Sequence, residues 1–142
     1  MTAKIDEPLI EIFKKYQNIA VLGMSRNMQK SSNWIPVYLS TKSYRIIPIN
    51  PKAGRIKGWK SYPDLRDVAG RIDILQVFRP PGEALDIVKA AIERKQKRGD
   101  ITVIWLQEGS NDEARKLAES EGIIFIQGRC MYREYKRLML KT

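Results

Sequence analysis

A loop of small, hydroxyl-bearing and cationic residues follows the apolar run 19–22 and precedes a predicted helix. It contains Gly23, Ser25, Arg26, Asn27, Lys30 and Ser31. Free N–H groups at a helix start carry partial positive charge, hydroxyls donate hydrogen bonds, and Arg or Lys pairs with phosphate oxygens. A glycine also lets a ligand come close to the backbone. The loop therefore predicts a phosphate-binding site, and the alternative is an ordinary turn in which Ser31 or Ser32 caps the helix.

The commonest nucleotide-binding motifs are absent from this loop. It matches neither GxGxxG nor GxxxxGK[ST]. The second predicted strand ends in Asn50, Pro51 and Lys52, whereas a NAD-binding fold has Asp or Glu there for the ribose hydroxyl. Lys52 and the next three cations, Arg55, Lys57 and Lys60, predict either a contact with a phosphate on or near a ribose or a solvated basic loop.

Three further residue groups follow predicted strands. Phe78 and Arg79 offer an aromatic face beside a cation, which suits an adenine ring or a pantetheine chain, although Phe78 fits a core position equally well. Gln107 is placed to hydrogen-bond a ligand amide. Cys130 lies between basic residues that would favour its thiolate, and the alternative is a packed, inert cysteine.

Composition excludes several classes of chemistry. The sequence has no histidine, which excludes Ser-His-Asp and Cys-His catalysis and zinc sites with imidazole ligands. Its single cysteine excludes an internal disulfide or CxxC pair, and we expect no metal site. The net charge of +10 favours an anionic partner. We do not expect nucleic acid, because the stacking aromatics and recognisable modules of such binders are missing.

Alternating strands and helices must position these residues. The sequence predicts strands at 19–22, 44–49, 72–78, 101–106 and 123–126. Helices are expected near 5–16, where Asp6 is the expected cap, and near 31–41, 82–97, 111–121 and 131–140. The second helix carries Trp34, Val37, Tyr38 and Thr41 on one side, segment 50–61 is a predicted loop, and 63–67 a helical turn. This order predicts a Rossmann-like α/β fold, a doubly wound parallel five-stranded sheet with helices on both faces and ligands at the carboxyl ends of its strands.

The chain length fits one domain, residues 1–142. No apolar run reaches the roughly 18 residues of a membrane span, and the first residues carry acids where a secretory signal has its apolar core. We therefore expect a cytoplasmic protein without a membrane partner.

Six motifs occur in an order typical of one family. They are IAVLGMS at 19–25, IPINPK at 47–52, GWKSYPDL at 58–65, VFR at 77–79, WLQEG at 105–109 and RC at 129–130. Over about residues 15–139 the chain resembles the small single-domain CoA-binding proteins, which are related to the CoA-binding Rossmann domain of succinyl-CoA synthetase alpha subunits.

The resemblance implies where coenzyme A would lie. The phosphates would contact the loop with Gly23, Ser25, Arg26 and Lys30, and the adenosine would lie near Asn50, Pro51 and Lys52. The pantetheine would run past Phe78, Arg79 and Gln107, with its thiol near Cys130.

The synthetases' phosphorylated histidine has no counterpart, so a complete ligase is excluded. We expect binding of CoA or an acyl-CoA without catalysis. The alternative is a NAD(P)-binding or CoA-disulfide-handling redox enzyme that uses Cys130. Association with a second copy or a partner protein stays open, and the basic last helix has no predicted role beyond packing and charge.

Overall fold

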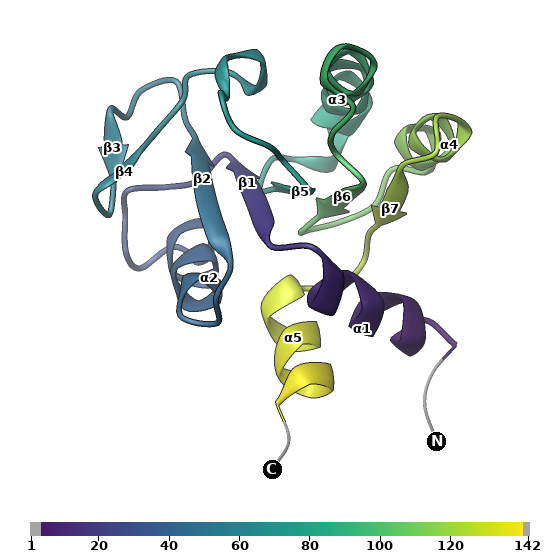
Figure 1. The fold of residues 1–142 in the computed structure, drawn as a ribbon, viewed down its shortest axis with the longest axis horizontal. Coiled ribbons are helices and arrows are strands. Elements are labelled where there is room, and N and C mark those ends of the chain that lie inside the picture. The colour runs from purple at the N-terminus through teal and green to yellow at the C-terminus, as the bar shows by residue number, and fades with distance from the viewer. Residues whose placement is uncertain (1–3, 141–142) are drawn as a thin grey trace.

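The computed structural model describes residues 4–140 and contains a five-stranded parallel sheet in the order β2-β1-β5-β6-β7 (Figure 1). The strands are β1 (Asn18–Leu22), β2 (Arg45–Ile49), β5 (Ile74–Val77), β6 (Val103–Leu106) and β7 (Ile124–Ile126). In the register of the central strands, Ala20 pairs with Ile47 on one side and with Leu75 on the other. The short apolar runs are buried on both faces, as parallel strands covered by helices must be.

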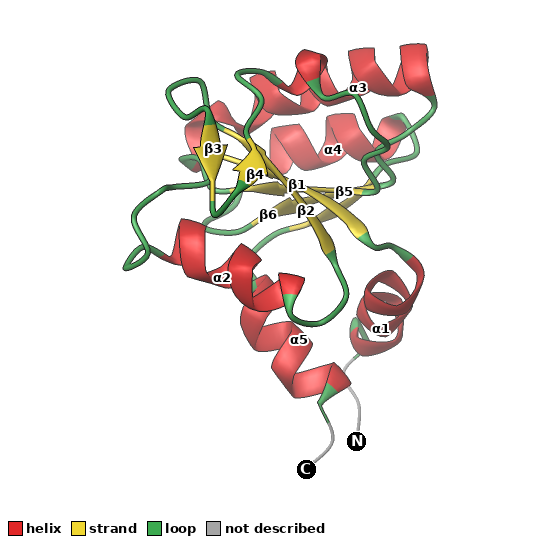
Figure 2. Cartoon of the chain, turned by 60° about the vertical axis from the view of Figure 1, so that its left-hand side comes forward, coloured by secondary structure: helices red, strands yellow, loops and turns green. Residues whose placement is uncertain are grey.

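Helices cover both faces of the sheet (Figure 2). On one face lie α1 (Asp6–Lys15), α2 (Ser31–Ser40) and α5 (Met131–Met139), and on the other lie α3 (Ala84–Arg98) and α4 (Asp112–Ser120). Alternate strand residues divide between the two cores, so that Val21 and Trp105 face α1, α2 and α5, whereas Ala20 and Leu75 face α3 and α4. The arrangement confirms the predicted Rossmann-like fold.

The start and the inner face of α2 differ from the prediction. Lys30 occupies the N-cap position, and no side chain caps the helix, so the expected serine cap is wrong. The buried residues of α2 are Asn33, Ile35, Pro36 and Leu39. Trp34 turns toward α5 instead, where its ring meets that of Tyr132 edge-on at 5.0 Å. Trp34 therefore packs against the helix α5, and the side of α2 that carries it is not the side buried against the sheet.

Segment 50–61 is not entirely loop. It contains a two-stranded antiparallel hairpin of β3 (Arg55–Ile56) and β4 (Trp59–Lys60), outside the main sheet beyond β2 (Figure 1). Its turn places Lys57 and Gly58 in the left-handed region, at φ 53° and 81°. The predicted helical turn near 63–67 is present as the 3-10 turn η1 (Leu65–Asp67), and a second such turn, η2 (Pro81–Glu83), precedes α3.

The basic helix α5 is joined to the start of the chain. Arg137 donates hydrogen bonds to Asp6 at 2.7 and 3.1 Å and pairs with Glu134. Asp6 lies inside α1, whose N-cap is Ile5, so it does not serve as the predicted cap. Within residues 4–140, no helix is long and apolar enough to cross a membrane.

Candidate functional site

A pocket of about 770 Å³ opens at the carboxyl edge of the sheet, between the segments that follow β1, β2 and β5. Eight of the predicted site residues line it: Gly23, Ser25, Lys30, Asn50, Pro51, Lys52, Phe78 and Arg79. Residues far apart in the sequence meet here because parallel strands end at the same edge.

A second pocket, of about 480 Å³, adjoins the first toward the end of β6. It shares Lys30, Ser32, Phe78 and Arg79 with the first pocket and adds Ser31, Pro80, Pro81 and Glu108. We call the two together the carboxyl-edge groove. Lys30, which immediately precedes α2, lines both parts, so its ammonium is the loop cation best placed to meet an anion in the groove.

Two buried or half-buried amides hold the first loop in place. Asn33, on the inner face of α2, donates to the Ser25 carbonyl oxygen at 2.7 Å. Asn50 donates to the Met24 carbonyl oxygen at 2.9 Å, which ties the loop after β1 to the end of β2. The sequence analysis missed Asn33, although a polar residue on the inner side of an apolar helix signals such a contact.

The tip of the first loop lies outside the groove lining. Arg26 and Asn27 are exposed and line neither pocket. The Asn27 side chain accepts a hydrogen bond from the Gln29 N–H at 3.0 Å, and its own N–H donates to Ser25 Oγ at 3.0 Å. Asn27 therefore shapes the turn.

Arg79 lines the groove as an ion pair. Its guanidinium donates to both carboxylate oxygens of Glu83, at 2.8 and 3.0 Å. These hydrogen bonds hold the pKa of Glu83 below its ordinary value. An anion that binds Arg79 must therefore compete with a neighbouring carboxylate, which the sequence analysis did not foresee.

Gln107, which follows β6, and Cys130, which precedes α5, are not among the residues that line the groove. The Gln107 Oε1 atom accepts hydrogen bonds from Gln76 Nε2 and from the Met131 N–H, both at 3.2 Å. Cys130 is the partly exposed N-cap residue of α5. Arg129, one of its basic neighbours in sequence, pairs with Glu134 at 3.4 Å. The predicted contacts of Gln107 and Cys130 with a ligand stay predictions.

The sequence analysis gave no ligand role to one wall of the groove. Pro63, Asp64, Leu65 and Arg66 contribute to the lining. Segment 65–70 is held from behind by Arg94, which donates to the carbonyl oxygens of Leu65, Val68 and Gly70 at 2.8 to 3.0 Å. Arg94 also pairs with Asp100 at 2.9 Å, and both side chains are almost fully buried. The sequence analysis missed Arg94, although it follows Val88 and Ala91 at helical spacing on the buried side of α3.

The structure shows why position 23 requires glycine. Its φ is +85°, and a Cβ atom there would lie 2.7 Å from the Phe78 carbonyl oxygen. The predicted role, close approach of a ligand to the backbone, is therefore joined by close packing between the loops after β1 and β5.

Comparisons with known proteins agree with this arrangement. A family model described as a CoA binding domain matches residues 17–136. The uncharacterised protein YneT of Bacillus subtilis is 30% identical over 122 residues, which cover 85% of this chain and 87% of YneT. Acetate–CoA ligase (ADP-forming) II of Archaeoglobus fulgidus is 29% identical over 107 residues, which cover 74% of this chain and 15% of the ligase.

A solved structure shows the same likeness along the whole chain. A hypothetical protein from Pyrococcus horikoshii OT3 is similar with a TM-score of 0.88 and 32% sequence identity, over 99% of each chain. Since the family model spans the sheet and the segments that form the carboxyl-edge groove, the chain belongs to the CoA-binding domain family.

Proposed function

We propose that the protein binds coenzyme A or an acyl-CoA in the carboxyl-edge groove, without catalysis of its own. The observation that carries the proposal is the gathering of eight predicted ligand residues around one pocket at the carboxyl edge, in a member of the CoA-binding domain family. In sheets of this kind, ligands bind outside the carboxyl ends of the strands.

Each part of the groove suits one part of coenzyme A. Lys30 and the N–H groups at the start of α2 suit the phosphates. Asn50, Pro51 and Lys52 line the first pocket together with the Pro63–Arg66 wall, and the adenosine would contact both segments. Phe78, which lines both pockets, offers an apolar contact for the pantetheine on its way toward the end of β6.

The redox alternative finds less support. A nicotinamide cofactor calls for an acidic side chain at the end of β2, where Asn50 instead donates its amide to the Met24 carbonyl. Cys130, which a CoA-disulfide reaction would use, lies outside the residues that line the groove.

Calorimetric titration tests the proposal. We expect CoA to bind more tightly than NAD. The affinity for CoA should fall as the salt concentration rises, because its phosphates meet side-chain cations. Lys30→Ala should cost about 1–3 kcal/mol of binding free energy, the scale of a hydrogen bond to a charged group. Arg26→Ala should cost less because Arg26 lines neither pocket.

Lys116→Ala, on the exposed side of α4, is the matched control for loss of one positive charge and should bind like the parent. Equal or tighter binding of NAD would refute the choice of ligand. Unchanged CoA affinity in Lys30→Ala would refute the placement of the phosphates.

The Arg79–Glu83 pair supports a second prediction at the same site. Glu83→Gln should strengthen CoA binding by up to about fivefold at low salt, because it frees Arg79 and removes a carboxylate from the groove. Glu93→Gln breaks an exposed ion pair with Lys97 on α3, outside the groove lining, and should leave the CoA affinity unchanged. Weaker binding by Glu83→Gln would show that the carboxylate helps to bind the ligand and does not compete with it.

A further inference from the structure

A third hollow, of about 490 Å³, lies beside β2, which forms one edge of the main sheet. It shares no lining residue with the carboxyl-edge groove. Its lining comprises Ser40, Tyr44, Arg45, Ile46, Ile47, Trp59, Lys60, Tyr62, Val68 and Gly70. We call it the edge groove. It lies between β2, the hairpin strand β4 and residues of segment 62–70.

Hydrogen bonds along β2 alternate between its two sides. The Arg45 N–H donates to Gln17 and the Ile49 carbonyl accepts from Gly23, so these residues face β1. On the outer side, the Pro48 carbonyl accepts from the Tyr62 N–H at 3.0 Å, and the Asn50 N–H donates to the Tyr62 carbonyl at 2.9 Å. Tyr62 thus covers the end of the outer edge in place of a sixth strand.

Among residues 4–140, no strand pairs with the outer edge of β2 one step earlier, at Ile46, whose exposed fraction is 6%. Ile46 points its N–H and C=O to the same side as Pro48, because successive strand residues alternate. The outermost pairing of β2 is the single bridge between Ile49 and Tyr62, and within residues 4–140 no strand pairs with Ile46 on that side. Unpaired backbone groups at a sheet edge are a template for another strand.

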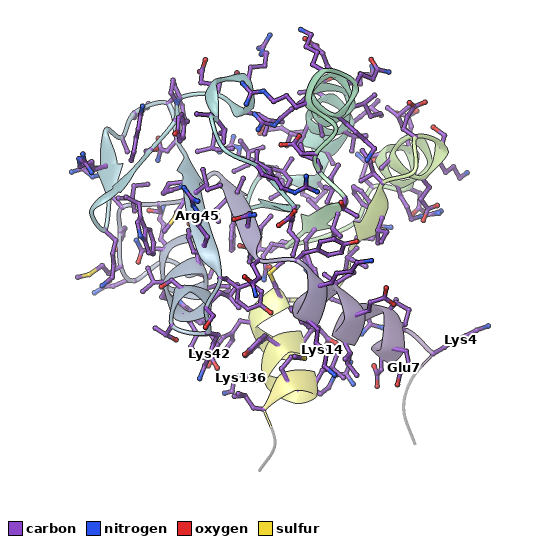
Figure 3. All side chains as sticks on the ribbon, in the orientation of Figure 1. Lys4, Glu7, Lys14, Lys42, Arg45 and Lys136 are labelled. Atoms are coloured by element: carbon purple, nitrogen blue, oxygen red, sulfur yellow. The ribbon has the colours of Figure 1, made fainter. Side chains whose placement is uncertain are left out.

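The lining of the edge groove indicates what such a strand would carry. Its apolar lining consists of the half-buried Trp59 and of Ile47 and Val68, which are 8% and 0% exposed. Arg45 and Lys60 are its exposed cations, with Arg45 labelled on β2 in Figure 3, and among the described residues no Asp or Glu lines the hollow. Extended peptides that add to a sheet edge gain affinity from main-chain hydrogen bonds and specificity from alternate side chains.

We propose that the edge groove binds an extended segment of a partner protein, with apolar and acidic residues in alternation, which pairs with the Ile46 backbone as a short added strand. A second copy of this chain fits poorly. Pairing two β2 edges would set one chain of net charge +10 against another and bring the Arg45 side chains of both copies into the same short interface.

The test uses a capped seven-residue peptide of alternating glutamate and valine, titrated into isotopically labelled protein. We expect saturable binding with amide shifts at Ile46, Trp59 and Tyr62. N-methylation of either all valines or all glutamates blocks one edge of the peptide only. One of these two peptides should therefore lose at least tenfold in affinity while the other still binds.

Charge variants separate the edge groove from general attraction to a basic protein. Arg45→Glu and Lys60→Glu should each weaken binding by about fivefold, and Lys116→Glu on α4 should have little effect. The proposal is overturned by absence of saturable binding, by equal weakening in all three variants, or by equal binding of both methylated peptides. It is also overturned if sedimentation shows a dimer whose formation shifts the same amides, since the occupant would then be a second copy.

Discussion

Replacing Arg94 with methionine is expected to lower the free energy of unfolding by about 3–5 kcal/mol, because it leaves Asp100 charged and buried without its partner. The substitution also removes donors from the carbonyl oxygens of Leu65, Val68 and Gly70. Urea unfolding followed by circular dichroism measures the change.

Arg98→Met is the matched control. Arg98 lies one turn further along α3 and donates to the Ala69 carbonyl at 3.0 Å, but it is exposed, so its loss should cost less than about 1 kcal/mol. The double variant Arg94→Met with Asp100→Leu should recover part of the lost stability, because no buried charge is then left unpaired. A loss below about 1 kcal/mol for Arg94→Met alone would contradict the importance assigned to this pair.

Replacing Gly23 with alanine is the second substitution with a large expected effect, a loss of about 2–4 kcal/mol of stability. One part is the left-handed conformation, φ +85°, which costs a non-glycine residue about 1 kcal/mol. The larger part is the Cβ atom, which would lie 2.7 Å from the Phe78 carbonyl oxygen and would force the ends of β1 and β5 apart.

Two other glycines separate these contributions. Gly58 has φ +81° but open space around its Cβ position, so Gly58→Ala should show the conformational cost alone. Gly54 has open space and no left-handed φ, so Gly54→Ala should be nearly neutral. Thermal unfolding of the three variants tests the order, and equal losses for Gly23→Ala and Gly58→Ala would show that the close packing against Phe78 contributes nothing.

Periodicity predicted the strands and helices of the main sheet because buried parallel strands are short and apolar throughout, and the helices between them are amphipathic. It misjudged α2, whose Trp34 and Tyr38 pack against Tyr132 of the last helix. A helix that contacts both a sheet and another helix has two apolar sides. The spacing of apolar residues alone does not show which of the two sides faces the sheet.

The order of strands in the sequence was enough to predict that the site residues lie at the carboxyl edge. It was not enough to predict which charged side chains pair with one another there. That Arg79 is bound by Glu83 depends on the short turn η2, which brings position 83 back toward the end of β5. The role of Arg94 depends on its burial between α3 and segment 65–70. The Arg79–Glu83 pair is local but depends on the turn η2, whereas the contacts of Arg94 with segment 65–70 join residues 24 to 29 positions apart and leave no local signal in the sequence.

Mapping of amide shifts on titration with CoA tests the central claim most directly. The proposal predicts saturable 1:1 binding, with the largest shifts in residues 23–25, 30–32, 50–52, 63–66, 78–81 and 83, which line the carboxyl-edge groove. The β3–β4 hairpin at 55–60 and the helix α4, which contribute no residue to the groove lining, should show little change. Absence of saturable binding, or shifts that cluster away from the carboxyl edge, would contradict the proposed function.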